Sequence, residues 1–219
     1  MDRLIYQALS GLNSSLNSLK VASNNVANAN SVGFKEQLVN TISTKQQHNA
    51  LYDTRAYATT STSLNTTQHM VYTGNVTDIA IKDGFLKIKD AQNNIKYIST
   101  ASVKINIDNQ LTTQNNDLVL DESDNPIELN DIKDLTKTEI PIFKGSISNN
   151  DFNGGYQLTT PEVDETNKLL FGYKEESNVD LNKNLLNIIE AQQKFNLNMQ
   201  LLNVEKENSN KRLQILEKG

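Results

Sequence analysis

The chain has 219 residues, a formal net charge of −5 and no cysteine. Binding to nucleic acid needs an excess of basic residues to displace counterions, and this acidic chain has none, so we expect no nucleic-acid partner. No run of eighteen apolar residues is present, so we expect no membrane-spanning helix. One basic residue, Arg3, precedes a stretch in which polar residues interrupt every apolar run, so we expect no cleavable secretory signal.

A heptad pattern of apolar residues predicts a helix over residues 2–30. Its members are separated by alternating steps of four and three, the spacing of a stripe that packs against another helix. They are Ile5, Leu9, Leu12, Leu16, Leu19 and Val26. Four asparagines crowd the last turns: Asn24, Asn25, Asn28 and Asn30. The next glycine, Gly33, predicts a left-handed cap with φ > 0, and Phe34 is expected to anchor the chain where it leaves the helix.

A second heptad stripe predicts a longer helix at the other end of the chain, after an N-cap at Ser177 or Asp180. Its apolar members are Leu181, Leu185, Ile188, Phe195, Met199, Leu202, Leu213 and Leu216. Beside them runs a second apolar line: Leu186, Ile189, Leu197, Leu201 and Val204. One partner helix covers only one stripe, so this surface favours packing against several neighbours; pairing of the two terminal helices inside one molecule stays the alternative.

Residues 36–70 show no regular apolar pattern, and residues 59–68 are rich in threonine and serine. Such a segment cannot bury enough apolar area to fold alone. We expect it to be either a mobile linker or an extended arm that lies along a partner.

Short alternating segments from Val71 onward predict an antiparallel β domain. Asp83-Gly84 predicts a hairpin between a strand through Ile79 and Ile81 and a strand at 85–89. Further strands are expected at 95–98, 103–107 and 118–120, with weaker ones near 139–144 and 156–158. Asparagine and aspartate predict the turns at 92–94, 108–109, 115–117 and 123–126.

The expected fold class is α+β, with amino- and carboxyl-terminal helices paired as a coiled-coil-like unit and an antiparallel β domain inserted between them. The expected divisions are an amino-terminal helix with its motif (1–35), a polar arm (36–70), the β domain (71–177) and a carboxyl-terminal helix (178–219).

The residue types that catalysis needs form no recognisable pattern. Both histidines, His48 and His69, fall in the polar segment, without further residues at metal-ligand spacing. Asp121, Glu122 and Asp124 lack the following glycine and glutamate of a calcium loop, and indicate a turn. We expect no enzyme activity, cofactor, metal or small-molecule ligand; a hydrolase that uses carboxylates of the β domain is the alternative.

Stretches at both ends and in the middle of the chain resemble signatures of the bacterial flagellar rod and hook proteins. Residues 24–35 resemble "NN-hydrophobic-AN-x-x-T/S-x-GFK", and residues 72–85 resemble the stretch that begins the family's β domain. Residues 176–181 and 188–195 resemble its "SNV" and "AQR-x-F" signatures, with Gln193 at the usual arginine, and residues 1–8 look most like the proximal rod members. The positions that carry the motifs are Asn24, Asn25, Ala27, Asn28, Gly33, Phe34, Lys35, Asn178, Val179 and Gln192.

The resemblance implies a structural subunit of the flagellar rod whose partners are other rod subunits and copies of itself. Family members are exported unfolded by the flagellar export apparatus, without a cleaved signal, and stack helically in the basal body within the periplasmic space. Their terminal helices form an inner tube that helps to transmit torque from motor to hook. The alternatives are a distal rod or hook-family protein and, from another class, a non-flagellar coiled-coil surface protein with a β head.

Overall fold

The computed structural model describes residues 2–47, 54–65, 67–149, 155–164 and 169–216. The chain divides into two compact units. The helical unit comprises 1–29, 36–65 and 179–219, and the β unit comprises 30–35 and 66–178. Helices near both ends of the sequence and antiparallel strands between them confirm the α+β class.

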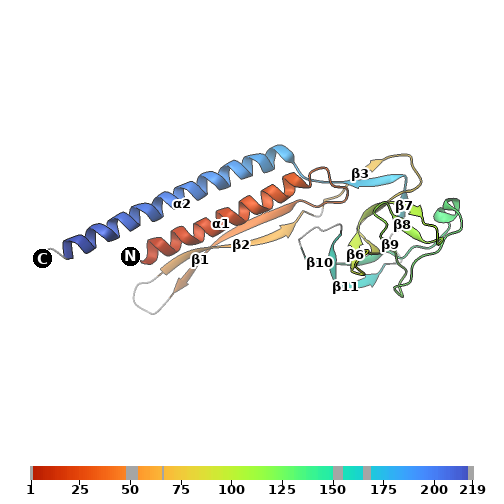
Figure 1. The fold of residues 1–219 in the computed structure, drawn as a ribbon, viewed down its shortest axis with the longest axis horizontal. Helices are drawn as coiled ribbons and strands as arrows, with labels where there is room; N and C mark the ends of the chain where they lie inside the picture. Colours follow the sequence, from red (N-terminus) through yellow and green to blue (C-terminus); the bar gives the residue numbers. More distant parts are fainter. Residues whose placement is uncertain (1, 48–53, 66, 150–154, 165–168, 217–219) are drawn as a thin grey trace. The chain divides into compact units, whose positions relative to one another are not determined.

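Two long helices dominate the helical unit, α1 (Asp2–Ala27) and α2 (Leu181–Leu216). Figure 1 shows them side by side. They run antiparallel, because Asn25 of α1 bonds to Asn184 near the start of α2, whereas Gly11 faces Asn198 farther along. α1 ends three residues before the predicted boundary at 30.

Asp180 caps the start of α2. Its Oδ1 accepts the main-chain N–H of Lys183 at 3.0 Å, which satisfies one of the free donors in the first helical turn. Of the two N-caps that the sequence offers, Asp180 is therefore the one adjoining the helix.

The polar segment 36–70 contains a long β-hairpin, where the sequence predicts a linker or an arm. β1 (Gln37–Gln47) and β2 (Thr54–Leu64) pair antiparallel without a register shift, with Gln37 opposite Leu64. The hairpin lies along α1 (Figure 1). Threonine favours extended backbone, which agrees with strands in this segment. However, the hairpin packs against a helix that is distant in sequence, so the segment on its own does not indicate that the hairpin forms.

A seven-stranded antiparallel sheet forms the centre of the β unit, in the order β12-β4-β7-β8-β9-β5-β6. Its strands are β4 (Asp78–Ile81), β5 (Leu86–Lys89), β6 (Ile95–Ile98), β7 (Thr100–Ile105), β8 (Leu111–Thr113), β9 (Leu118–Val119) and β12 (Leu169–Phe171). Two smaller pairs are β3 (His69–Tyr72) with β13 (Tyr173–Glu176), and β10 (Phe143–Asn149) with β11 (Gln157–Val163). The core of the sheet includes Ile79, Ile81, Leu86, Leu111 and Leu135 of the short helix η1 (Ile132–Thr136).

The hairpin predicted at Asp83-Gly84 is wrong. Asp83 has φ of 58°, so the chain does turn there. However, β4 pairs with β7 and β12, whereas β5 pairs with β6 and β9. All four residues of β4 are buried, and strands from distant parts of the chain occupy both of its edges, which local turn chemistry does not encode.

The other asparagine and aspartate turns are confirmed. Asn93, Asn109, Asn116 and Asp124 lie in the four predicted turns and have φ between 59° and 67°. Short polar side chains tolerate this left-handed conformation better than other non-glycine residues do, which explains their positions.

Asp78 fastens the start of β4 to three neighbouring segments. Its carboxylate accepts hydrogen bonds from the hydroxyls of Ser102 at 2.6 Å and Thr73 at 2.7 Å, and pairs with Lys174 at 3.3 Å. Burial by itself raises the pKa of Asp78, but these hydrogen bonds and the lysine outweigh it and hold the pKa below the ordinary 3.8.

We predict that an Asp78→Asn variant is less stable than the wild type at neutral pH, and that this difference vanishes in acid. A carboxylate whose pKa is lowered by folding stabilises the protein above its unfolded pKa of about 3.8, and that stability is lost as pH falls through the folded value. Thermal unfolding of both proteins between pH 7 and strong acid measures it, with exposed Asp108→Asn as control. A difference that stays constant with pH would contradict the role of the charge.

Candidate assembly surface and motif residues

The buried face of α1 consists mostly of small and polar residues. Its buried members are Ala8, Leu12, Ser15, Val21, Ala22 and Asn25. Of the predicted apolar stripe, Leu12 is buried and Leu19 and Val26 are half-buried. The remaining members are exposed: Ile5 by 38%, Leu9 by 47% and Leu16 by 50%.

The buried face of α2 also consists mostly of small and polar residues. Asn184, Ala191 and Glu205 are its buried residues within the part of the helix whose side chains the structure describes. Of the predicted stripe, Ile188, Phe195 and Leu202 are half-buried, and Leu181, Leu185 and Met199 are exposed. The predictions for Leu213 and Leu216 fall on side chains outside the described residues.

In each helix, half of the predicted apolar stripe faces the partner helix. The other inward positions each lie one residue before a predicted stripe position, and small or polar residues occupy them in place of the larger apolar ones. Small residues allow close approach: a Cβ added at Gly11 would lie 2.7 Å from Oδ1 of Asn198. The larger side chains then remain on the outside.

Both helices accordingly have exposed large apolar residues along their outer surfaces. The second apolar line of α2 is fully on the outside, with Leu186 exposed by 62% and Leu197 by 60%. Ile189, Leu201 and Val204 complete it. Exposed apolar surface of this extent is typical of a surface that another protein covers.

Asn25, the second asparagine of the motif, joins three segments of the helical unit. Its Nδ2 donates to the main-chain oxygen of Gln37 and to Oδ1 of Asn184, both at 2.8 Å, and its Oδ1 accepts the N–H of Gln37 at 2.9 Å. Asn184 in turn donates to Oε1 of Glu36 at 3.0 Å. Asn25 is 1% exposed and uses both donors and its acceptor, so it links the end of α1 to β1 and to α2.

The neighbouring motif residues support this link less directly. Asn24 donates to Oε1 of Gln37 at 3.2 Å, and Asn28 donates to the main-chain oxygen of Asn24 at 3.0 Å. Ala27 and Gln192 are exposed. Asn24 and Asn25 thus bond to other segments, where the sequence indicates only that the asparagines end the helix.

Gly33, Phe34 and Lys35 belong to the β unit. Gly33 has φ of +72°, which confirms the predicted left-handed conformation. The predicted helix cap is wrong, because Gly33 follows the end of α1 by six residues and its N–H donates to the oxygen of Glu175 at 2.8 Å. Phe34 is 1% exposed, as expected of an apolar anchor.

Lys35 forms a buried ion pair that the sequence does not reveal. Its Nζ lies 2.7 Å from Oε1 of Glu175, with the two side chains 4% and 2% exposed. Its main-chain N–H donates to the Tyr156 hydroxyl at 2.8 Å. Burial of two charges stabilises a fold only with such close geometry, and removal of one partner alone leaves a costly unpaired charge.

The carboxyl-terminal motif residues lie where the chain passes from β13 toward α2. Asn178 donates to the main-chain oxygen of Thr67 at 2.7 Å within the β unit. Val179 is half-buried in the helical unit. Glu175 and Asn184 were not singled out in the sequence, although Glu175 directly precedes the quoted signature.

The described residues include no candidate metal site. No three of their His, Cys, Asp or Glu side chains are placed to hold a metal ion, and His48 lies outside them. Asp121 closes a turn by accepting the N–H groups of Ser123 and Asn125, each at 2.8 Å. None of the described helices is long and apolar enough to cross a membrane.

We predict that Asn25→Ala destabilises the helical unit by about 2–4 kcal/mol, because the buried N–H and C=O of Gln37 lose their partner. Urea unfolding followed by far-ultraviolet circular dichroism measures the change. The matched control is Asn182→Ala, an exposed asparagine in the first turn of α2. Equal stability of the two variants would contradict a structural link through Asn25.

A second prediction concerns Gly33. Left-handed backbone costs a non-glycine residue roughly 1–2 kcal/mol, less for asparagine and more for a β-branched residue. A Cβ at this position would also lie 3.0 Å from Cγ2 of Thr100. Thermal unfolding should therefore show a modest loss for Gly33→Asn and a larger one for Gly33→Val, and equal losses would contradict the conformational requirement.

Comparison with known proteins matches both ends of the chain to one family. The family model described as "Flagella basal body rod protein" matches residues 5–35, and the model "Flagellar basal body rod FlgEFG protein C-terminal" matches residues 172–215. The first range holds most of α1 and the Gly33 motif, and the second holds β13 and nearly all of α2.

Two relatives cover almost the whole chain, and a third covers about half of it. "Flagellar basal-body rod protein FlgF" of Escherichia coli (strain K12) is 24% identical over 249 residues, covering 99% of each chain. FlgF of Buchnera aphidicola subsp. Schizaphis graminum is 24% identical over 241 residues, covering 95% of this chain and 96% of its own. FlgF of Salmonella typhimurium (strain LT2) is 30% identical over 122 residues, or 54% of this chain and 48% of its own. The chain is thus similar to FlgF rod proteins along nearly its whole length, and both of its ends match models of flagellar basal-body rod proteins.

Proposed function

We propose that this chain is a structural subunit of the flagellar rod, in its proximal part, and that it acts by assembling with other rod subunits. The observation that carries the proposal is the placement of apolar residues on α1 and α2. Small and polar residues take many of the inward positions, and half of the large apolar residues of the predicted stripes stay on the outside. A helix pair of this kind is incomplete as a soluble surface and becomes buried when subunits stack.

The magnitude of the hydrophobic gain favours assembly. Leu9 and Leu16 on α1, and Leu186, Leu197 and Leu201 on α2, are each exposed by between 47% and 62%. Fully burying one such side chain contributes about 1.5–3 kcal/mol. Several half-exposed residues in every subunit supply enough to offset the loss of translational and rotational freedom on association.

The rod role carries further expectations for the chain. It is non-enzymatic, passes through the flagellar export apparatus unfolded and without a cleaved signal, and functions in the periplasmic part of the basal body. The terminal helices pack in coiled-coil-like fashion with one another and with neighbouring subunits. Many such contacts in a helical stack let a rotating rod pass torque from motor to hook.

The near full-length similarity to proteins named FlgF favours the proximal rod over the distal rod and the hook. A non-flagellar surface protein with a β head remains the competing class. Loss of the gene should abolish the hook while growth stays normal for a rod subunit, whereas loss of a surface protein should leave the hook intact.

We predict that the same substitution at two neighbouring stripe positions affects different properties: subunit stability at one position and assembly at the other. Leu12 is 7% exposed, so Leu12→Asp buries an unpaired carboxylate and should lower the thermal stability of the isolated subunit by several kcal/mol. Leu16 is 50% exposed, so Leu16→Asp should leave subunit stability nearly unchanged but abolish hook formation and motility.

Asn13→Asp, at an exposed polar position between them, is the matched control and should support motility. Thermal unfolding of the purified proteins, together with electron microscopy of basal bodies, separates the two effects. Normal hooks in the Leu16→Asp strain would contradict the proposed function.

A further inference from the structure

A groove lies between α1, α2 and β1 in the helical unit. It encloses about 650 Å³. Small residues of α1 line it, among them Gly11, Ser15, Ser18 and Ala22. It follows α1 from Gly11 to Asn25, roughly 21 Å at 1.5 Å per residue.

The hydrogen-bonding edge of β1 along this groove can be read from the register. Asn65 donates its N–H to the oxygen of Glu36 at 2.8 Å, so Glu36 belongs to the positions that bond toward β2. The strand pairing continues without a shift, so Leu38 and Asn40 also bond toward β2. Gln37, Val39 and Thr41 therefore direct their N–H and C=O groups to the opposite edge.

At Gln37, the first of these outward positions, the Asn25 side chain takes the place of a neighbouring strand. The side-chain amide of Asn25 accepts from the N–H of Gln37 and donates to its oxygen, as the main chain of a neighbouring strand would. In the part of the chain that the structure describes, no group bonds to the outward N–H or C=O of Val39 or Thr41. An open edge of this kind is a template for one more strand.

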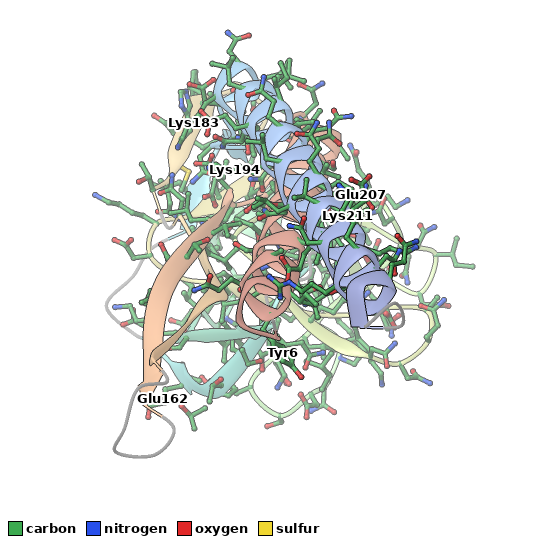
Figure 2. All side chains as sticks on the ribbon, turned by 90° about the vertical axis from the view of Figure 1, so that its left-hand side faces the viewer. Tyr6, Glu162, Lys183, Lys194, Glu207 and Lys211 are labelled. Carbon is green, nitrogen blue, oxygen red and sulfur yellow. The ribbon has the colours of Figure 1, made fainter. Side chains whose placement is uncertain are left out.

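The charges around the groove favour an uncharged occupant. Lys183 lies 3.6 Å from Oε1 of Glu36, and Lys194 lies 3.7 Å from Oε2 of Glu190, so the two cations are paired with two anions. Figure 2 shows Lys183 and Lys194 on the side of α2 toward β1, with Glu207 and Lys211 on the other side. Nothing in this balance attracts a strongly charged segment.

We propose that the groove receives β2 of a second copy of this chain, which adds to the free edge of β1; the inference rests on the proposed rod function. Residues 58–63 of β2 are alanine, threonine and serine with no charge. Six residues of extended chain span roughly 20 Å, close to the length of the groove. By the same register, Ala58, Thr60 and Thr62 direct their main-chain groups away from β1 of their own chain.

The resulting contact propagates. When copies are related by a simple shift, β2 of the second copy runs antiparallel to β1 of the first, and the order β1-β2-β1-β2 continues through the stack. Such a contact joins two different surfaces, and its repetition generates an open helical assembly when the rotation between copies does not close a ring.

Disulfide trapping tests the proposal directly, because the chain has no cysteine of its own. A Val39→Cys chain is expressed together with a chain that carries Ala58→Cys, Thr60→Cys or Thr62→Cys, and basal bodies are isolated after oxidation. We expect one of these pairs to give linked dimers severalfold more often than Val39→Cys with Lys137→Cys, a control at an exposed position of the β unit. No pair above the control, or preferential linking of Val39→Cys to itself, would overturn the proposal.

A backbone variant distinguishes this inference from the rod function itself. Val39→Pro removes the outward N–H and obstructs an added strand while it leaves the bonds from β1 to β2 in place. Val39→Ala removes the same side chain but keeps the N–H. We expect hooks to be lost with Val39→Pro and retained with Val39→Ala, at equal subunit stability.

Wild-type hook formation by Val39→Pro would overturn the strand contact. If Leu16→Asp still abolishes the hook in that case, the rod function stands and only the strand contact fails. Should Val39→Pro weaken the subunit itself, the disulfide pairs decide alone.

Discussion

The contact between α1 and α2 determines which residues of the helical unit are buried and which stay exposed. On each helix, one line of predicted stripe residues faces the partner helix, as the sequence predicts. The second inward line does not consist of the predicted large apolar residues. It consists of Ala8, Ser15 and Ala22 on α1 and of Asn184, Ala191 and Glu205 on α2. Close approach of the backbones follows, and the larger apolar side chains are left for other contacts.

Polar residues then provide the specificity that a line of small residues lacks. Asn25 holds the end of α1 against the first residue of β1 and the first turns of α2, with every donor and acceptor of its amide in use. Buried amides of this kind favour one register over others, because a shifted helix would leave them unpaired. The motif also serves the β unit, where Lys35 pairs with Glu175 in a site closed to solvent.

Much of this arrangement follows from the sequence. The heptad patterns predict the bounds of both helices to within a few residues. Asparagine and aspartate predict the turns of the sheet, as at Asn93 and Asn109. The motifs pointed to the flagellar rod family, which the comparisons bear out.

The failures share a physical cause. Composition alone ranks leucine above alanine as an inward residue, so the displaced helix contact was missed. The β1–β2 hairpin depends on α1, and the pairing of β4 depends on β12, which lies some ninety residues away in the sequence. The partner of Lys35 is likewise a distant glutamate. Local patterns predict local structure, but these choices are made by contacts between distant segments.

The central claim is that Leu16 is exposed in the free subunit and buried in the rod. Since the chain has no cysteine, a Leu16→Cys variant carries a single thiol whose reaction with a maleimide reports its exposure. The account predicts rapid labelling of the purified subunit and strong protection in isolated basal bodies, with an Asn13→Cys variant labelled in the purified subunit as a control. Protection of Leu16→Cys already in the free subunit, or equal labelling in both states, would contradict it.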